Sequence, residues 1–116
     1  MTGTLHVVDR GSGPAVVLLH AFPCAGAMWE PQAARLVDAG FRVLVPDLPG
    51  FGASTLPEVE PSLEAVAATL IAMIDEREAG PCILGGVSLG GYLAMAILRA
   101  RPDLARAVVL CGTKAT

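Results

Sequence analysis

Short apolar runs alternate with segments of helical spacing along this chain, and that alternation restricts the fold more than any other feature. Four runs are typical of buried strands: 15–19, 41–45, 81–87 and 107–111. The segments between them carry apolar residues at the spacing of amphipathic helices: 29–39, 62–78 and 89–100. Strands that alternate with helices in this way predict an α/β fold with a mostly parallel sheet and right-handed crossovers.

Turn and cap residues set the boundaries of these elements. Residues 5–8 form a further short strand candidate, and the segment 10–14 that follows is rich in residues that favour turns. Gly40 supplies a stop signal for the first helix, and Ser62 is placed to cap the second. The proline-rich segment 47–61 is expected to be a long ordered loop.

Composition restricts the binding partners and the cellular compartment that we expect for this protein. The 116 residues suffice for one domain, and 53% of them are apolar, which fits strands buried on both faces. A net charge of -3 and the absence of a basic run argue against nucleic acid and anionic membranes. No apolar run is long enough to span a membrane, and the N-terminus has no leader pattern. Three cysteines without close spacing favour a cytoplasmic protein with neither disulfide nor zinc site.

The most specific motif is Gly-x-Ser-x-Gly at 86–90, where a predicted strand turns directly into a predicted helix. Such an elbow holds its serine, here Ser88, exposed above the sheet, and Gly86 and Gly90 allow the close packing that it needs. The Leu89 N–H then lies at a helix N-terminus, where it can stabilise an oxyanion. The alternative is a glycine-rich turn whose serine only caps the helix. A phosphate-binding Gly-x-Gly-x-x-Gly is not satisfied within 85–91.

Two further motifs precede the elbow, His-Ala-Phe-Pro at 20–23 and Asp-Leu-Pro-Gly-Phe-Gly-Ala-Ser at 47–54. With the elbow, they make the chain resemble the α/β-hydrolase fold family, especially its small esterase and enol-lactonase-like members. The resemblance covers nearly the whole chain and implies a three-layer sandwich. It implies that residues 1–116 correspond to the N-terminal half of that fold, a partial domain without the C-terminal strands, the lid, the catalytic acid and the catalytic histidine.

The resemblance also implies a role for each motif residue. Ser88 would be the nucleophile, and the backbone N–H groups of Phe22 and Leu89 would form the oxyanion hole. His20 and Asp47 would support the loops. Ala21 stands where the family usually has glycine, so either the loop is shifted or this position has negative φ. The residues themselves leave simpler alternatives: Phe22 packs over the core, and Asp47 accepts hydrogen bonds from loop N–H groups.

A serine hydrolase needs a base and a carboxylate that orients it, and the sequence offers no clear candidate for either. A makeshift set of Ser88, His20 and Asp47 is conceivable, because the family's strand order would place their strands side by side. Cys24 and Cys111 fall near the same end, but such cysteines are more often buried apolar residues. Met28 and Trp29 can either line an acyl pocket or pack in the core.

The expected enzyme hydrolyses a small carboxylic ester or lactone through a Ser88 acyl-enzyme, without a metal or organic cofactor. By the resemblance, a serine at the elbow argues against dehalogenases and epoxide hydrolases, which use a carboxylate, and leaves carbon–carbon hydrolases and perhydrolases open. The rival hypotheses are a non-catalytic half that binds a partner chain or a small acyl ligand, and a flavodoxin-like binding domain.

The strand 107–111 also bears on assembly. It is apolar and has neither proline nor charge inside it, and the resemblance makes it an interior strand of a larger sheet. A free edge of this kind recruits another strand. We therefore expect a homo-oligomer, or a complex with a complementary C-terminal fragment, with this strand at the interface. The alternative is that residues 112–116 fold back over the edge.

Overall fold

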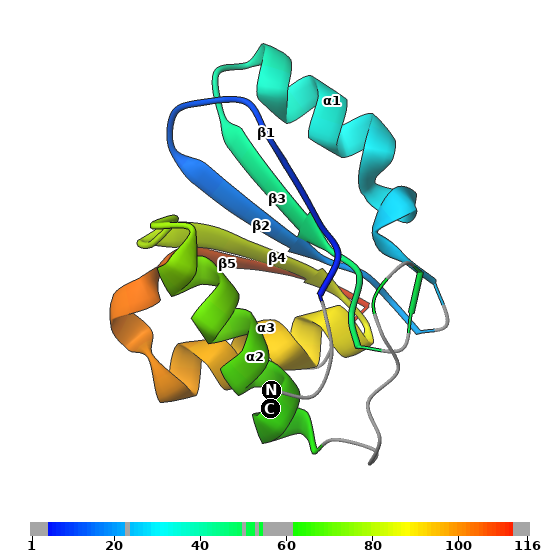
Figure 1. Ribbon diagram of the computed structural model, residues 1–116, viewed down its shortest axis with the longest axis vertical. Coiled ribbons are helices and arrows are strands. Elements are labelled where there is room, and N and C mark those ends of the chain that lie inside the picture. The colour runs from blue at the N-terminus through cyan, green and yellow to red at the C-terminus, as the bar shows by residue number, and fades with distance from the viewer. Residues whose placement is uncertain (1–4, 23, 50, 53, 55–61, 113–116) are drawn as a thin grey trace.

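A computed structural model describes residues 5–22, 24–49, 51, 52, 54 and 62–112 as a sheet covered by helices on both faces (Figure 1). Its strands are β1 (Val7–Arg10), β2 (Ala15–Leu19), β3 (Arg42–Pro46), β4 (Cys82–Val87) and β5 (Ala105–Cys111). Its α-helices are α1 (Glu30–Asp38), α2 (Leu63–Glu76) and α3 (Leu89–Ala100), and short 3-10 helices precede α1 and β5.

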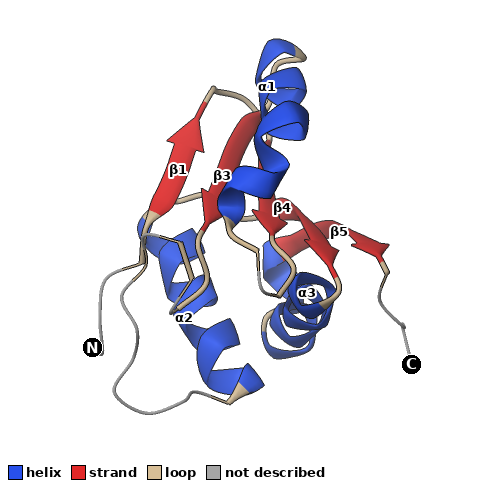
Figure 2. Ribbon diagram, turned by 90° about the vertical axis from the view of Figure 1, so that its right-hand side faces the viewer, coloured by secondary structure: helices blue, strands red, loops and turns tan. Residues whose placement is uncertain are grey.

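The strands lie in the order β1-β3-β2-β4-β5. β3, β2, β4 and β5 run parallel to one another, and β1 pairs antiparallel with β3 at one edge. Helix α1 lies on one face of the sheet, while α2 and α3 lie on the other (Figure 2). The predicted α/β class, with three layers and a mostly parallel sheet, is therefore confirmed.

Most predicted elements match the structure to within two residues. Ser62 caps α2, since its hydroxyl accepts a hydrogen bond from the Ala65 N–H at 3.1 Å. The strand predicted at 5–8 begins and ends two residues later, because Asp9 and Arg10 still pair with Leu44 and Val43 of β3. The last strand begins at Ala105 rather than at 107. Of the predicted loop 47–61, residues 50, 53 and 55–61 lie outside the described residues.

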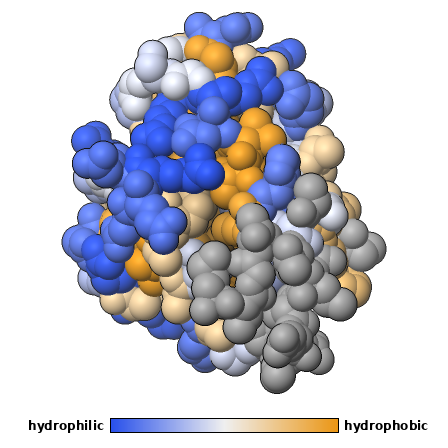
Figure 3. Space-filling model, viewed as in Figure 1, coloured by the Kyte–Doolittle hydropathy of each residue, from blue (hydrophilic) through white to orange (hydrophobic). Residues whose placement is uncertain are grey.

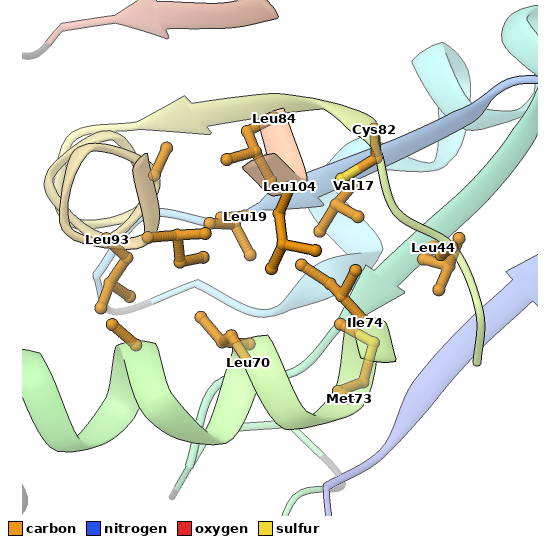
Figure 4. Packing of buried hydrophobic residues seen from close by; sticks show 14 of the residues in the cluster. Val17, Leu19, Leu44, Leu70, Met73, Ile74, Cys82, Leu84, Leu93 and Leu104 are labelled. Carbon is orange, nitrogen blue, oxygen red and sulfur yellow. The ribbon is translucent and has the colours of Figure 1, made fainter. Parts of the chain in front are cut away.

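The apolar core is divided between the two faces by the alternation of side chains along each strand. The larger cluster lies between the sheet and helices α2 and α3, where Val17, Leu19 and Leu84 meet Leu70 and Leu93 (Figure 4). The neighbouring residues Val16, Leu18, Val43 and Val45 point the other way and pack with α1. Every residue of β2 is buried, as the unbroken apolar run predicts.

Asp9 joins β1 to β3 and to the end of α2 through two ion pairs. Its carboxylate accepts hydrogen bonds from Arg42 at 2.8 Å and from Arg77 at 3.0 Å. The bond from Arg42, helped by that from Arg77, lowers the pKa of the Asp9 carboxyl, although partial burial acts in the opposite direction. The ionised Asp9 carboxylate therefore stabilises the fold at pH values above the ordinary aspartate pKa, and this stabilisation is lost as the pH falls through the lowered pKa.

Hydrophilic side chains gather over the upper part of the face seen in Figure 1, with apolar residues beside them (Figure 3).

Helix α3 starts in close contact with the sheet, and two glycines permit this. A Cβ on Gly90 would overlap the carbonyl oxygen of Leu19 at the end of β2, and a Cβ on Gly86 would overlap the backbone of Gly90. By contrast, the nearest atom to a Cβ on Gly85 would be the flexible end of the Leu18 side chain, at 3.0 Å, and backbone would lie no closer than 3.9 Å. The first turn of α3 therefore rests directly on the carboxyl end of β2.

Strand β5 pairs with β4 along one edge, and no described strand pairs with its other edge (Figure 2). No residue of β5 is fully buried, whereas β4 has four buried residues among its six. Val109 of this strand is 55% exposed. Among the described strands, β5 thus forms one edge of the sheet and carries an exposed apolar side chain.

We predict that Gly90→Ala and Gly86→Ala each destabilise the fold, by about 1–3 kcal/mol or more, because the added methyl group overlaps backbone that cannot move aside. Gly85→Ala is the matched control, since its neighbour is a flexible side chain. Chemical denaturation of the three variants measures the difference. Equal stability of Gly85→Ala and Gly90→Ala would contradict the close contact described above.

We predict also that the purified chain associates through the free edge of β5, because unpaired edges recruit further strands. Sedimentation across a dilution series should show self-association that Val109→Lys weakens. Val8→Lys, on the opposite edge strand, is the control and should leave the association unchanged. A monomer at every concentration, with Val109→Lys behaving like the parent chain, would refute the idea.

Candidate active site

Ser88 lies between the end of β4 and the start of α3 with φ 54° and ψ -113°. Positive φ is costly for a residue with a side chain, so this conformation stores strain. Backbone hydrogen bonds hold it: the Ser88 N–H donates to the Cys111 carbonyl at 3.0 Å, and the Ser88 carbonyl accepts from the Gly91 N–H at 3.0 Å. Ser88 is exposed, and its side chain makes no capping hydrogen bond to α3. The geometry is that of a strand-to-helix elbow and not of a capping serine.

Leu89 is the first residue of the 12-residue helix α3. The first N–H groups of a helix have no acceptor within the helix, and the helix dipole adds partial positive charge there. The N–H groups of Gly91 and Tyr92 are used by the Ser88 carbonyl. The elbow thus carries its hydroxyl beside a helix end suited to a developing negative charge.

The loop after β2 begins with His20, which is completely buried. Its Nε2 accepts a hydrogen bond from the Leu48 N–H at 2.9 Å, and its Nδ1 lies 2.9 Å from the Ala21 carbonyl oxygen. That carbonyl also accepts from the Cys24 N–H at 2.8 Å, which closes a turn. Among the described non-glycine residues only Glu78 and Ser88 have positive φ, so Ala21 takes the place of a glycine at negative φ.

Phe22 lies on the surface, with 67% of the residue exposed. Its ring meets the ring of Phe51 edge to face, with centroids 5.6 Å apart, and Phe51 meets His20 in the same way at 5.4 Å. The alternative that Phe22 packs over the core is wrong, since the residue is largely exposed and its ring contacts Phe51 of the loop after β3. Its N–H as an oxyanion donor stays a prediction.

Asp47 ties the two loops together from a buried position. Its Oδ1 accepts a hydrogen bond from the Gly26 N–H at 2.6 Å, at the start of the 3-10 helix that leads into α1. A Cβ on Gly52 would overlap the Asp47 carboxylate, so the chain also passes closely over its other side. The Asp47 carbonyl accepts from the Ser54 hydroxyl, and the Ser54 hydroxyl accepts from the His6 N–H.

The conceivable set of Ser88, His20 and Asp47 is not a catalytic triad here. Their strands β4, β2 and β3 are neighbours, as expected. However, both ring nitrogens of His20 are engaged by backbone groups, so no lone pair is left for the Ser88 proton. Asp47 holds Gly26 instead of His20. The remaining histidine, His6, is exposed and precedes β1.

The cysteines differ from the expectation that those near this end are buried. Cys24 and Cys111 are both exposed, because one lies in the surface turn after His20 and the other ends the edge strand β5. Only Cys82 is buried, and desolvation raises the pKa of its thiol to about 11. A raised pKa disfavours the reactive thiolate.

Of the two pocket candidates, Trp29 packs against the apolar cluster under α1, as core packing predicts. Met28 is exposed, and its sulfur accepts a hydrogen bond from the Ala21 N–H at 3.4 Å. Sequence reasoning missed this contact, and it missed Gly26 as the partner of Asp47 and the edge-to-face contacts of Phe51. No local pattern signals the contacts of Asp47 and Phe51, because these join segments more than 20 residues apart in the chain.

Metal and membrane signals are absent from the part of the chain that the structure describes. Its His, Cys, Asp and Glu side chains form no group of three or more that could hold a metal ion. None of the described helices combines the length and apolarity that a membrane span requires.

Comparison with known proteins agrees with this geometry. The chain is 37% identical over 111 residues to bifunctional epoxide hydrolase 2 of Sus scrofa, a match that covers 94% of this chain and 20% of that protein. A thermophilic esterase from Thermogutta terrifontis superposes with a TM-score of 0.92 and 39% identity over 97% of this chain and 42% of its own. An esterase from Exiguobacterium antarcticum gives a TM-score of 0.92 and 30% identity, with the same coverage.

The chain thus spans a fifth of the first relative and about two fifths of the solved esterases. Residues 16–115 match the sequence profile described as the alpha/beta hydrolase family. That range includes the loop after β2, the loop after β3 and the elbow. The chain belongs to the alpha/beta hydrolase family.

Proposed function

We propose that this chain supplies the nucleophile and the oxyanion donors of a serine hydrolase that cleaves carboxylic esters or lactones. The observation that carries the proposal is the exposed Ser88, held at positive φ between a buried strand and a helix N-terminus. Such a position places Oγ above the sheet edge and the Leu89 N–H beside it. Membership of a hydrolase family supports the reaction class.

The reaction would run in two stages. Ser88 Oγ attacks the carbonyl carbon and gives up its proton, and the carbonyl oxygen becomes an oxyanion that accepts hydrogen bonds from the Leu89 and Phe22 N–H groups. Collapse expels the alcohol, which takes a proton, and leaves an acyl-serine. Water then attacks this ester, so that the acid is released and the Ser88 hydroxyl is restored. Both stages need a base that neither described histidine provides.

The hydroxyl of Ser88 favours acyl transfer over epoxide opening, although several relatives are named epoxide hydrolases. A carboxylate that opens an epoxide forms an ester, which water can hydrolyse. A serine that opens an epoxide forms an ether, which has no carbonyl for water to attack and blocks turnover. With an acyl substrate the same serine forms a hydrolysable ester.

A second candidate is a non-catalytic role in which the chain binds a partner chain or a small acyl ligand. The engagement of both His20 nitrogens by backbone groups favours it, since the described residues then lack a base beside Ser88. The free edge of β5 is the surface through which a partner strand would bind. The three cysteines form no disulfide with one another, and two of them are exposed, which supports a reducing compartment such as the cytoplasm.

We predict that a fluorophosphonate probe labels Ser88 and no other residue, because Ser88 joins an exposed hydroxyl at a strained elbow to N–H donors for the phosphonyl oxygen. Mass spectrometry of the digested adduct locates the label. Ser62→Ala, which removes another exposed serine, is the control and should label like the parent chain. Labelling that persists in Ser88→Ala would refute the assignment of Ser88 as the reactive nucleophile.

We predict that the purified chain hydrolyses p-nitrophenyl acetate slowly, at most ~10³ to 10⁴-fold faster than water, which is what an oxyanion hole and binding leave when a triad member is missing. Rates for the parent chain and for Ser88→Ala, measured at several pH values, test this. Turnover as fast as that of ordinary esterases, lost in Ser88→Ala, would show that a base exists within these residues.

A further inference from the structure

We propose that Met28 is an oxidation site through which a peroxide slows the reaction at Ser88. The Met28 thioether accepts a hydrogen bond from the Ala21 N–H, at the start of the turn that carries Phe22, and it is open to solvent. The effect on Ser88 rests on the proposed function. The oxidation of Met28 and its effect on the turn rest on contacts in the structure.

Met28 is the only exposed methionine in the part of the chain that the structure describes. It lies in the 3-10 helix Gly26–Trp29, with 37% of the residue exposed. Met73 is buried in the core between the sheet and α2, and Met95 on α3 is half-buried. Because an oxidant has to reach the sulfur from solvent, we expect Met28 to be oxidised before the other two.

Both backbone polar groups of Ala21 are held by hydrogen bonds. Its N–H donates to Met28 Sδ at 3.4 Å, and within the described residues this thioether is the one acceptor that the N–H has. Its carbonyl accepts from the Cys24 N–H at 2.8 Å and lies 2.9 Å from Nδ1 of His20. A thioether is a weak acceptor, so the N–H side is the weaker of the two supports. The Met28 sulfur thus joins the 3-10 helix to the start of the Phe22 turn.

Hydrogen peroxide would convert this thioether to a sulfoxide. A sulfur lone pair attacks one peroxide oxygen, the O–O bond breaks and an S–O bond forms. The proton of the transferred oxygen passes to the departing hydroxide, which leaves as water. The sulfur is oxidised by two electrons and the peroxide is reduced by two. Methionine sulfoxide reductases reverse the change, with one enzyme for each sulfoxide epimer, so the modification is reversible.

Either epimer of the sulfoxide disrupts the contact with Ala21. An oxygen on the lone pair that faces the N–H would have to fit within the 3.4 Å between nitrogen and sulfur, although an N–H···O contact alone needs about 2.7 Å. The Met28 side chain would then have to move away. An oxygen on the other lone pair leaves the N–H facing a sulfur that the S–O dipole makes positive, so the hydrogen bond is lost. In both cases the turn shifts, and the Phe22 N–H shifts with it.

Treatment of the parent chain with dilute hydrogen peroxide, followed by peptide mapping with mass spectrometry, tests the site itself. Met28 should become sulfoxide faster than Met95 and much faster than Met73. The NMR signal of the Ala21 N–H should move as Met28 is oxidised, because that N–H loses its acceptor. Oxidation of Met28 no faster than that of Met73, or an Ala21 signal that does not respond, would overturn the proposal.

The rate of Ser88 phosphonylation by a fluorophosphonate gives the functional readout. The oxidised parent chain should label about 10-fold to 10²-fold more slowly than the reduced one, since misplacing a group at the site by about 1 Å has an effect of up to that size. Met28→Leu keeps an apolar side chain of similar volume without the sulfur, so peroxide should leave its rate unchanged. Met95→Leu is the matched control and should respond to peroxide like the parent chain.

Reductants separate Met28 from the exposed thiols of Cys24 and Cys111. The lost rate should persist in dithiothreitol, which reduces disulfides and sulfenic acids, and should return when both methionine sulfoxide reductases are added. Recovery in dithiothreitol alone, or an equal loss in Met28→Leu, would overturn the proposal. If the parent chain is not labelled at Ser88, the proposed function fails. The peptide map and the Ala21 signal then still decide whether Met28 is an oxidation site that holds the turn, because neither depends on chemistry at Ser88.

Discussion

The contact on which the site depends is the approach of the first turn of α3 to the carboxyl end of β2. Gly90 lies so close to the Leu19 carbonyl that a single methyl group would force the two apart. The same contact fixes how far Ser88 and Leu89 stand from the loop that begins at His20. Two N–H-bearing segments, distant in the sequence, thus come to one end of the sheet because glycine lets backbone rest on backbone.

Around this contact, buried polar groups organise the two supporting loops together with the packing of Leu48 and Phe51. His20 and Asp47 are buried, and buried polar groups are tolerated only when they are hydrogen-bonded. Each of them binds backbone N–H groups of another segment, so each replaces hydrogen bonds that an irregular loop lacks. The burial that makes these side chains costly when unpaired also makes their hydrogen bonds stronger than those on the surface.

The sequence was sufficient to predict the sheet, because buried parallel strands are continuous apolar runs and the helices between them carry their own start and stop residues. The elbow was predictable for a similar reason, since its glycines and serine are adjacent in the chain. What failed depends on distant partners. The register of β1 is held by Asp9 through Arg42 and Arg77, and the exposure of Cys111 follows from its place on an edge strand. Two partners of His20, Leu48 and Phe51, lie on another loop, and no spacing in the sequence predicts them.

A backbone hydrogen bond couples the strained elbow to the exposed edge strand β5. Ser88 keeps its positive φ partly because its N–H donates to Cys111, the last residue of β5. β5 is also the strand in which no residue is fully buried, and strands with few buried contacts open locally at the lowest free energy. Fraying of β5 at Cys111 would release one of the hydrogen bonds that oppose the strain at Ser88. A strand that paired with the outer edge of β5 would therefore also hold the Ser88 backbone more firmly.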